Sequence, residues 1–261
     1  MSHKPRKRFG QNFLRDDNVV FAIVSAIAPR SDQHLVEIGP GQGALTRLLL
    51  AEAGRLDVVE LDRDLVAELA RRFSGEARLS VHSADALKFD FNSLSSGEKL
   101  RVVGNLPYNI STPLLFHLFQ QSDVIADMHF MLQKEVVDRL CAAPGDKEYG
   151  RLGVMAQYYC DMQPLFDVPP ESFFPPPKVM SSVVRLVPHA QPPVEVVVEA
   201  LGKVVSAAFG QRRKTLRNAL GTLLTEEAIR AADVDPGERA ENLSLADYAR
   251  LAKRVEDQES G

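Results

Sequence analysis

The sequence predicts an α/β protein with a mainly parallel sheet, followed by a small helical region. From residue 34 to about residue 143, short apolar runs alternate with amphipathic stretches, as in strand–helix units. Beyond Pro188 the composition passes through a Pro-rich segment and becomes helical in pattern. The 261 residues, 45% of them hydrophobic, suffice for one large and one small domain. We therefore expect a domain over residues 1–188 and a helical domain over residues 189–261.

Strands and helices alternate regularly in the first part of the chain. Strands are expected at short runs rich in apolar residues, at 34–39, 56–62, 78–85, 100–105 and 127–133. Helices are expected between or after them, where apolar residues recur at helical spacing, at 43–53, 63–73, 112–121 and 134–143. This alternation favours parallel strands with helices on both faces. Residues 178–188 instead alternate apolar and polar residues, which predicts an antiparallel strand packed on one face.

The last part of the chain has only helical patterns. Helices are expected at 194–209, 212–224, 225–234 and 244–256. Ser244 and Asp247 have the spacing of a capping box, in which each residue caps the other at the start of a helix.

Several classes of protein are disfavoured by composition. The longest apolar run near the start, residues 21–28, is too short for a membrane span and follows two aspartates, which argues against a signal peptide. The two cysteines, Cys141 and Cys160, have no CxxC spacing, and no histidine pair has ligand spacing. We therefore expect a cytoplasmic protein with no membrane segment, no disulfide framework and no metal site.

Basic residues are concentrated in two clusters although the net charge is −4. The first cluster, near the start, contains Lys4, Arg6, Lys7 and Arg8, and the second contains Arg212, Arg213, Lys214 and Arg217. A single cluster of this kind is explained equally well as solvent-exposed surface and as a binding site. Two clusters with few intervening acids favour a polyanionic partner and are candidate RNA-binding residues.

The stretch VEIGPGQGALT places three glycines between a predicted strand and a helix. Glycines there let the backbone approach a ligand closely, and the helix N-terminus offers free N–H groups. A dinucleotide site is disfavoured because an acid, Glu37, precedes the glycines, and further acids, Glu60 and Asp85, end the next two strands. Carboxylates suit a ligand with an amino group and a positive centre better than a pyrophosphate.

The stretch RVVGNLPYNIS ends a predicted buried strand with residues that are poor strand formers. An exocyclic amine of a base is a weak nucleophile, because its lone pair is delocalised into the ring. The amide oxygen of Asn105 and the carbonyl of Leu106 could accept its N–H groups and direct that lone pair. Pro107 would fix the turn, and Tyr108 would offer a face on which an extruded base stacks. A plain β-turn is the alternative interpretation.

The order of these motifs resembles the class I S-adenosylmethionine methyltransferases, whose Rossmann-like domain has a mixed, mainly parallel seven-stranded sheet. Asn-Leu-Pro-Tyr is similar to the motif of enzymes that methylate exocyclic amines of adenine or cytosine. RFGQNFL, EIGPGQGALT, NLPYNIST, LQKEVVDRL, FFPPPKVMSSVVRL and FGQRRKTLRN together resemble the small-subunit ribosomal RNA adenine dimethyltransferases (the KsgA/RsmA family) over nearly the whole chain.

The resemblance implies S-adenosylmethionine as cofactor and roles for individual residues. Cofactor contacts are implied for Asn12, Leu14, Gly39, Gly41, Glu60, Asp85 and Asn105. Among these, Glu60 would bind the ribose and Asp85 the adenine. Catalytic or base-binding roles are implied for Asn105, Leu106, Pro107, Tyr108 and Phe173. Phe173 and Tyr108 would sandwich the target adenine, with Phe174 as the alternative to Phe173.

The implied reaction is dimethylation at N6 of two adjacent adenosines near the 3′ end of 16S rRNA, within the small (30S) ribosomal subunit or its precursor, by a monomeric enzyme. Three alternatives remain. One is a 23S-type Erm resistance methyltransferase, and a second is a DNA adenine methyltransferase. The third is a non-catalytic assembly factor that binds immature subunits and holds the cofactor only as a ligand.

Overall fold

The computed structural model describes residues 11–260, with side chains to residue 258, and divides the chain into two compact units. The first unit comprises residues up to 137 together with 163–188, and the second comprises 138–162 together with 189–261. The predicted domain of residues 1–188 therefore differs from the structure at residues 138–162. These residues join the second unit because α6 packs on α7 and the hydroxyl of Tyr149 donates to the carbonyl of Leu243 at 2.8 Å.

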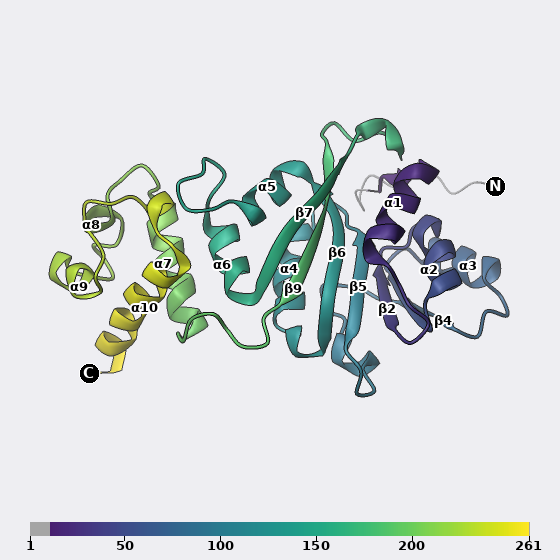
Figure 1. The fold of residues 1–261 in the computed structure, drawn as a ribbon, viewed down its shortest axis with the longest axis horizontal. Coiled ribbons are helices and arrows are strands. Elements are labelled where there is room, and N and C mark those ends of the chain that lie inside the picture. The colour runs from purple at the N-terminus through teal and green to yellow at the C-terminus, as the bar shows by residue number, and fades with distance from the viewer. Residues whose placement is uncertain (1–10, 261) are drawn as a thin grey trace. The chain divides into compact units, whose positions relative to one another are not determined.

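The first unit is built on a seven-stranded sheet with the order β4-β3-β2-β5-β6-β9-β7 (Figure 1). The strands are β2 (His34–Ile38), β3 (Arg55–Glu60), β4 (Leu79–Ser83), β5 (Leu100–Asn105), β6 (Ile125–Gln133), β7 (Cys160–Val168) and β9 (Ser181–Pro188). The pairs from β4 to β6 are parallel, and β9 is antiparallel to β6. The predicted mixed, mainly parallel sheet is confirmed. A separate two-stranded sheet pairs β1 (Phe13–Leu14) with β8 (Phe173–Phe174) in antiparallel fashion.

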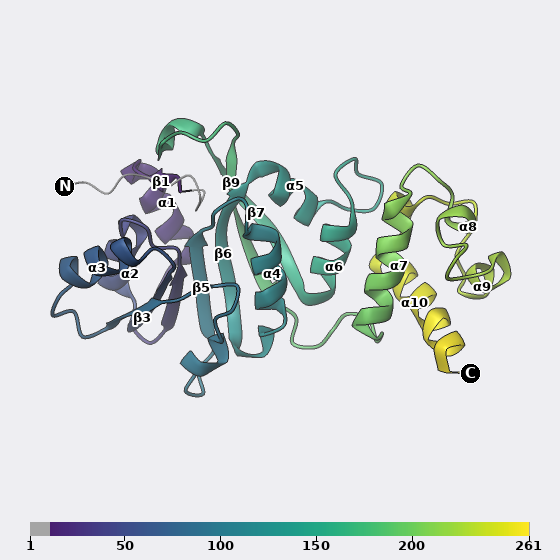
Figure 2. The same ribbon diagram turned by 180° about the vertical axis from the view of Figure 1, so that it is seen from behind.

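Helices cover both faces of this sheet. The helices that begin in the first unit are α1 (Asp17–Ile27), α2 (Ala44–Glu52), α3 (Arg63–Arg72), α4 (Ser111–Phe119) and α5 (Lys134–Cys141), with short 3-10 turns η2 (Phe91–Leu94), η3 (Ser122–Val124) and η4 (Pro170–Ser172). Figures 1 and 2 show α1 and α4 on opposite faces. Asp16 caps α1, because its carboxylate accepts from the backbone N–H groups of Asn18 and Val19. All four predicted helices are present, and α1 is additional.

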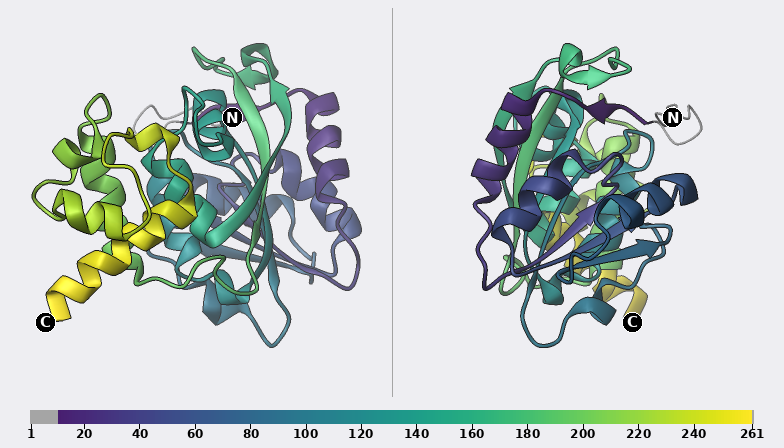
Figure 3. Two further views of the ribbon diagram at one scale, coloured as in Figure 1. Left: turned by 60° about the vertical axis from the view of Figure 1, so that its left-hand side comes forward. Right: turned by 90° about the vertical axis from the view of Figure 1, so that its right-hand side faces the viewer.

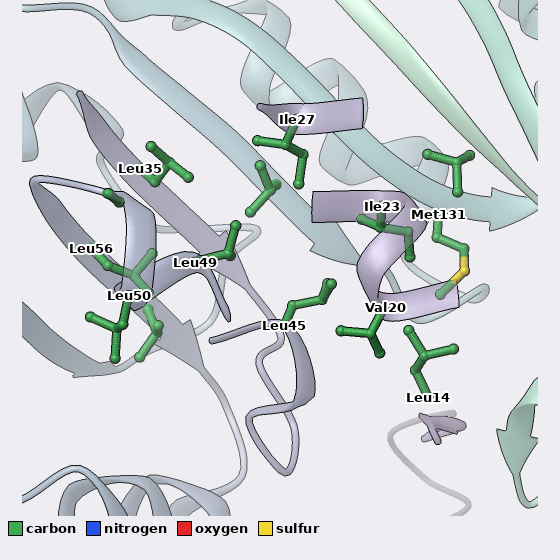
Figure 4. Close-up of a cluster of buried hydrophobic side chains, with 14 of the residues drawn as sticks. Leu14, Val20, Ile23, Ile27, Leu35, Leu45, Leu49, Leu50, Leu56 and Met131 are labelled. Carbon is green, nitrogen blue, oxygen red and sulfur yellow. The ribbon is translucent and has the colours of Figure 1, made fainter. Parts of the chain in front are cut away.

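One hydrophobic cluster joins α1 and α2 to the sheet (Figure 4). It includes Ile23 and Ile27 of α1, Leu49 of α2 and Leu35 of β2, each at most 4% exposed. At the rate of about 25 cal/mol per Å² of apolar surface buried, each such side chain contributes about 1.5–3 kcal/mol. The cluster therefore holds α1 and the glycine-rich turn before α2 at fixed positions against the strands.

The second unit is mainly helical; the helical pattern predicted beyond residue 189 is present, and α6 was not predicted. It contains α6 (Arg151–Tyr159), α7 (Val198–Gly210), α8 (Leu216–Ala219), α9 (Glu226–Ala231), α10 (Leu245–Ser260) and the 3-10 turn η5 (Ala240–Asn242). The capping box is confirmed, since the Ser244 backbone N–H donates to Asp247 Oδ2 at 2.8 Å and the Asp247 N–H to Ser244 Oγ at 3.2 Å. The helix predicted over 212–224 is largely wrong, because only α8 forms there.

Candidate functional site

A pocket opens where β2, β3 and β5 end. These parallel strands reach the same edge of the sheet, so the loops that follow them converge there. Its lining comes from four segments of the first unit: Gln11, Asn12, Phe13 and Leu14; Glu37, Gly39, Pro40, Gly41, Gln42, Ala44 and Leu45; Glu60 and Leu65; and Asn105, Leu106, Pro107 and Tyr108. The sequence predicted most of these side chains as one site.

The loop after β2 requires glycine. Gly39, Gly41 and Gly43 have φ angles of 66°, 56° and 77°, in the left-handed region that side chains disfavour. A Cβ atom on Gly41 would also lie 3.0 Å from the ring of Phe13. The loop thus turns tightly into α2 and stays open on the side that faces the pocket.

Two buried carboxylates line the pocket. Glu37 is 1% exposed and accepts a hydrogen bond from the hydroxyl of Thr46, with 2.6 Å between the oxygens. Burial raises the pKa of Glu37 to about 7, against the opposing effect of the Thr46 bond. Burial also raises the pKa of Glu60, although its carboxylate accepts from the N–H groups of Asp62 at 2.8 Å and Gly41 at 3.3 Å.

The carboxylate pair favours a cationic ligand. Among the described residues, no cationic side chain forms an ion pair with either Glu37 or Glu60. A buried carboxylate without a positive partner is costly to ionise, and a bound cation lowers that cost. The pocket therefore suits a positively charged group, as the sequence predicted from the acid before the glycines.

The segment after β5 lies beside the carboxylates and is held from three sides. The backbone N–H of Leu106 donates to the carbonyl of Met131 on β6 at 3.2 Å. The N–H of Ile110 donates to the carbonyl of Pro107 at 3.1 Å, which closes the turn. The hydroxyl of Tyr108 lies 2.7 Å from Ser181 Oγ at the start of β9. Asn105 and Tyr108 therefore project from a fixed turn.

The amide of Asn105 has a defined orientation. Its nitrogen donates to the backbone carbonyl of Asn12 at 3.1 Å. With the amide nitrogen engaged there, the oxygen Oδ1 points the other way and remains an acceptor. The N-terminal segment that carries Asn12 is itself held, because Gln11 Nε2 donates to Asp62 Oδ2 at 3.2 Å.

The structure separates the two adjacent phenylalanines. Phe173, which the sequence favoured as the ring that stacks on a base, is 4% exposed and belongs to the hydrophobic cluster with Leu14. Phe174 is 46% exposed. The register of the β1–β8 pair causes this difference, since Phe173 lies opposite Leu14 and successive residues of a strand face opposite sides. Phe173 thus has little exposed surface in this structure, and its stacking role stays a prediction.

Asp85 is not part of the pocket lining. It follows β4, one strand further out in the sheet, and its carboxylate accepts from the backbone N–H of Leu87 at 3.0 Å. The adenine contact expected of Asp85 stays a prediction. Several residues of the lining were not predicted, namely Gln11, Phe13, Pro40, Gln42, Ala44, Leu45 and Leu65. Asp62, which lies outside the lining, was not predicted either, although it accepts from Gln11 and caps α3. The Asp62 cap was signalled by its place before a helical run.

The second basic cluster lies in the second unit. Arg212 is engaged, because its Nε lies 2.7 Å from Glu241 Oε2 and its terminal nitrogen donates to the carbonyl of Lys147 at 2.6 Å. Arg213, Lys214 and Arg217 are exposed, and no ion pair involves them within residues 11–258. The first cluster, Lys4 to Arg8, lies outside the described residues.

Neither a metal-binding group nor a membrane-spanning helix is found in the described part of the chain. Its His, Cys, Asp and Glu side chains nowhere form a group of three or more that could hold a metal ion. None of the helices there is both long and apolar enough to span a membrane.

Comparison with known families gives a match over almost the whole sequence. The family model described as ribosomal RNA adenine dimethylase matches residues 2–257. A protein of Methylococcus capsulatus named ribosomal RNA small subunit methyltransferase A is 65% identical over 255 residues, covering 98% of this chain and 99% of the relative. A Pseudomonas aeruginosa protein of the same name is 59% identical, covering 97% and 95%.

Solved structures share the fold. A dimethyladenosine transferase from Plasmodium falciparum is similar with a TM-score of 0.79 and 25% identity, covering 95% of this chain and 98% of the other. The 23S rRNA methyltransferase ErmE is similar with a TM-score of 0.73 and 26% identity, covering 94% and 100%. Both are far less similar in sequence than the bacterial relatives.

Proposed function

We propose, from the premise that this chain belongs to the ribosomal RNA adenine dimethylase family, that it methylates N6 of two adjacent adenosines near the 3′ end of 16S rRNA. The family makes it an rRNA methyltransferase. The finer proposal concerns the methyl donor, the assembled small subunit as substrate, and the roles of individual residues. It rests above all on the oriented amide of Asn105 beside two buried carboxylates.

S-adenosylmethionine fits the pocket by its chemistry. It carries an ammonium group and a sulfonium centre, and Glu37 and Glu60 offer two buried carboxylates with no cationic partner in the described structure. When bound, this cofactor supplies an electrophilic methyl group. The N–H groups of Gly41 and Asp62 hold Glu60 in place. We propose that Glu60 accepts from the ribose hydroxyls, while Asn12 and Leu14 cover the bound ligand.

The residues after β5 activate the amine. Asn105 Oδ1 accepts one N–H of the adenine amine, and the carbonyl of Leu106 accepts the other, so that the nitrogen presents its lone pair to the methyl group. The bond from Asn105 to the carbonyl of Asn12 keeps the amide in this orientation. Tyr108, held by Ser181, provides a face for the extruded base. Positioning of this kind supplies much of the rate enhancement without a covalent intermediate.

The exposed cations of the second unit suit the RNA backbone. Arg213, Lys214 and Arg217 are open to solvent, so they can neutralise phosphates. We do not extend this role to Arg212, because its guanidinium is bound to Glu241 and the Lys147 carbonyl. An RNA is therefore the expected partner. We expect this RNA to belong to the small subunit, because the chain is 65% identical to a small-subunit methyltransferase and only 26% identical to ErmE.

The test is transfer of labelled methyl groups to three acceptors: small subunits that lack the modification, naked small-subunit RNA, and large-subunit RNA. Dimethyladenosine formed mainly on the unmodified small subunits supports the proposal. Label only on large-subunit RNA would assign the protein to the resistance enzymes. Subunit binding with no label on any acceptor would favour a non-catalytic assembly factor.

A further inference from the structure

Strand β8 ends in an exposed aromatic ring that the mechanism above does not use. Phe174 is 46% exposed, in contrast to its buried neighbour Phe173. The guanidinium carbon of Arg15 lies over the Phe174 ring, 4.2 Å from its centre. One face of the ring therefore carries a cation, and its exposure leaves a surface open to a further planar group.

Phe174 pairs with a residue of the pocket lining. Phe174 is the register partner of Phe13, which lines the pocket. The backbone N–H of Arg15 donates to the carbonyl of Ser172, the last residue of η4, at 2.8 Å. This bond joins the N-terminal segment to the turn before β8, and Figure 3 shows the ribbon of these segments from two sides. The loop that follows β8 leads into Ser181 at the start of β9, and the hydroxyl of Ser181 binds that of Tyr108. Phe174 is thus tied by two routes to residues that would hold the target base.

The surroundings of Phe174 suit a nucleic acid. Arg15 and Lys178 are exposed, and neither forms an ion pair with an acid in the described residues. Residues 173–180 contain no acid, although Glu171 precedes them. Val179 and Met180 are also exposed, at 42% and 38%. Aromatic rings beside cations form the surfaces on which single-stranded bases stack.

We propose that Phe174 and Arg15 form a stacking platform for a base adjacent to the methylated adenosine. This inference rests on the proposed function, because the substrate there has two consecutive adenosines. Extruding one base removes a stacking partner from its neighbour. The Phe174 ring replaces that partner outside the pocket, while Tyr108 holds the extruded base inside. The platform acts on RNA affinity and not on the transfer step.

The experiment measures the binding of unmodified small subunits to the wild type and to Phe174→Ala, as a dissociation constant and as KM in methyl transfer. Loss of one stacked base is expected to raise both by about fivefold to a hundredfold. The value of kcat and the calorimetric affinity for S-adenosylmethionine stay unchanged. Phe174→Trp retains wild-type binding because it retains the ring face. Phe21→Ala is the matched control, since Phe21 is 53% exposed on α1.

Each of the other outcomes would contradict either the stacking platform or the proposed function. Equal subunit affinity for Phe174→Ala and Phe21→Ala would overturn the platform. Loss of cofactor affinity in Phe174→Ala, with no rescue by tryptophan, would assign the residue to the fold of the β1–β8 pair and also overturn the platform. Wild-type protein that binds subunits without methylating them would contradict the proposed function, while the comparison of dissociation constants still decides the role of Phe174.

Discussion

Strands β2 and β3 carry ionisable side chains near both of their ends, and the two ends differ in how these charges are paired. Near the start, His34 Nε2 of β2 lies 2.6 Å from Asp57 Oδ2 of β3, and Arg55 Nε donates to the same carboxylate at 3.0 Å. Three residues further along each strand, both side chains are carboxylates, Glu37 and Glu60. These receive hydrogen bonds only from a hydroxyl and from backbone N–H groups among the described residues.

The difference is visible in the pKa values. Although burial pushes the pKa of Asp57 upward, hydrogen bonds from His34 and His82 and the charge of Arg55 hold it below its usual value. At the pocket end, burial prevails and raises the pKa of both Glu37 and Glu60. At one end of these strands, the carboxylate of Asp57 is paired with cationic groups of the protein. At the other end, the carboxylates of Glu37 and Glu60 have no cationic partner among the described residues and are available to a ligand. The first end is structural, and the second is the working end.

The largest expected effect tests the working end. We expect Asn105→Ala to lower kcat for methyl transfer by about a hundredfold to a thousandfold, as does the loss of one preorganised polar contact in other active sites. The cause is loss of the acceptor that orients the amine. Calorimetry should still show cofactor binding, because the two carboxylates remain. Normal turnover in this variant would contradict the amine-positioning argument.

The opposite end is tested by Asp57→Asn. This change leaves His34, His82 and Arg55 facing a neutral amide, and removing one partner of a buried ion pair costs about 3–5 kcal/mol. We expect the urea midpoint to fall at an unchanged m value, while kcat of the folded fraction stays at the wild-type level. A variant with normal stability and impaired transfer would show that the two ends are not separable.

Because Glu37 is buried, the free energy of unfolding depends on its protonation and therefore on pH. Its pKa rises from 4.5 to about 7 on folding, so the folded state binds the proton more tightly. The resulting stability is fully present below pH 4.5 and is lost as the pH rises through 7. About 2.5 pH units correspond to about 3 kcal/mol. Glu37→Gln, which is uncharged at every pH, should therefore equal the wild type near pH 4.5 and exceed its stability by up to about 3 kcal/mol at pH 8.

Urea unfolding at the two pH values, without cofactor, measures this difference. Asp57→Asn serves as the control from the opposite end, because the pKa of Asp57 is lowered and its contribution should be lost as the pH falls. A stability gap between Glu37→Gln and the wild type that does not change with pH would refute the raised pKa of Glu37.

The fold was predictable wherever hydrophobic pattern alone decides it. The parallel strands β2, β3 and β5 each contain adjacent apolar residues at their centre and are almost fully buried on both faces. β7 escaped prediction because it is an edge strand with exposed residues and an internal proline, Pro164, which edge strands tolerate. The helix expected at 212–224 failed because Arg212 and the Thr215–Arg239 bridge hold that segment in turns.

The site was predictable in its residue types but not in its pairings. Glu37 and Asn105 stand out because an acid and an amide are unusual at the end of buried strands. The sequence favoured Phe173 over Phe174 for stacking. Which of the two rings is exposed could not be predicted, because it depends on which of them lies opposite Leu14. Glu60 ends β3, whereas Asp85 lies two residues beyond the end of β4 and accepts from the N–H of Leu87. The contact expected of Asp85 stays a prediction.

The smallest expected effect compares two exposed arginines that each donate to a backbone carbonyl. Arg72 donates to Gln42 in the glycine loop at 2.7 Å, and Arg78, just before β4, donates to Ala53 at 3.1 Å. A single such bond contributes about 0.5–1.5 kcal/mol, so Arg72→Ala should weaken the binding of S-adenosylmethionine about threefold in calorimetry. Arg78→Ala should leave the affinity for S-adenosylmethionine unchanged, because Arg78 donates to Ala53 at the structural end of the strands. Equal affinities in the two variants would mean that the glycine loop keeps its shape without Arg72, and that burial of the strands alone prepares the working end.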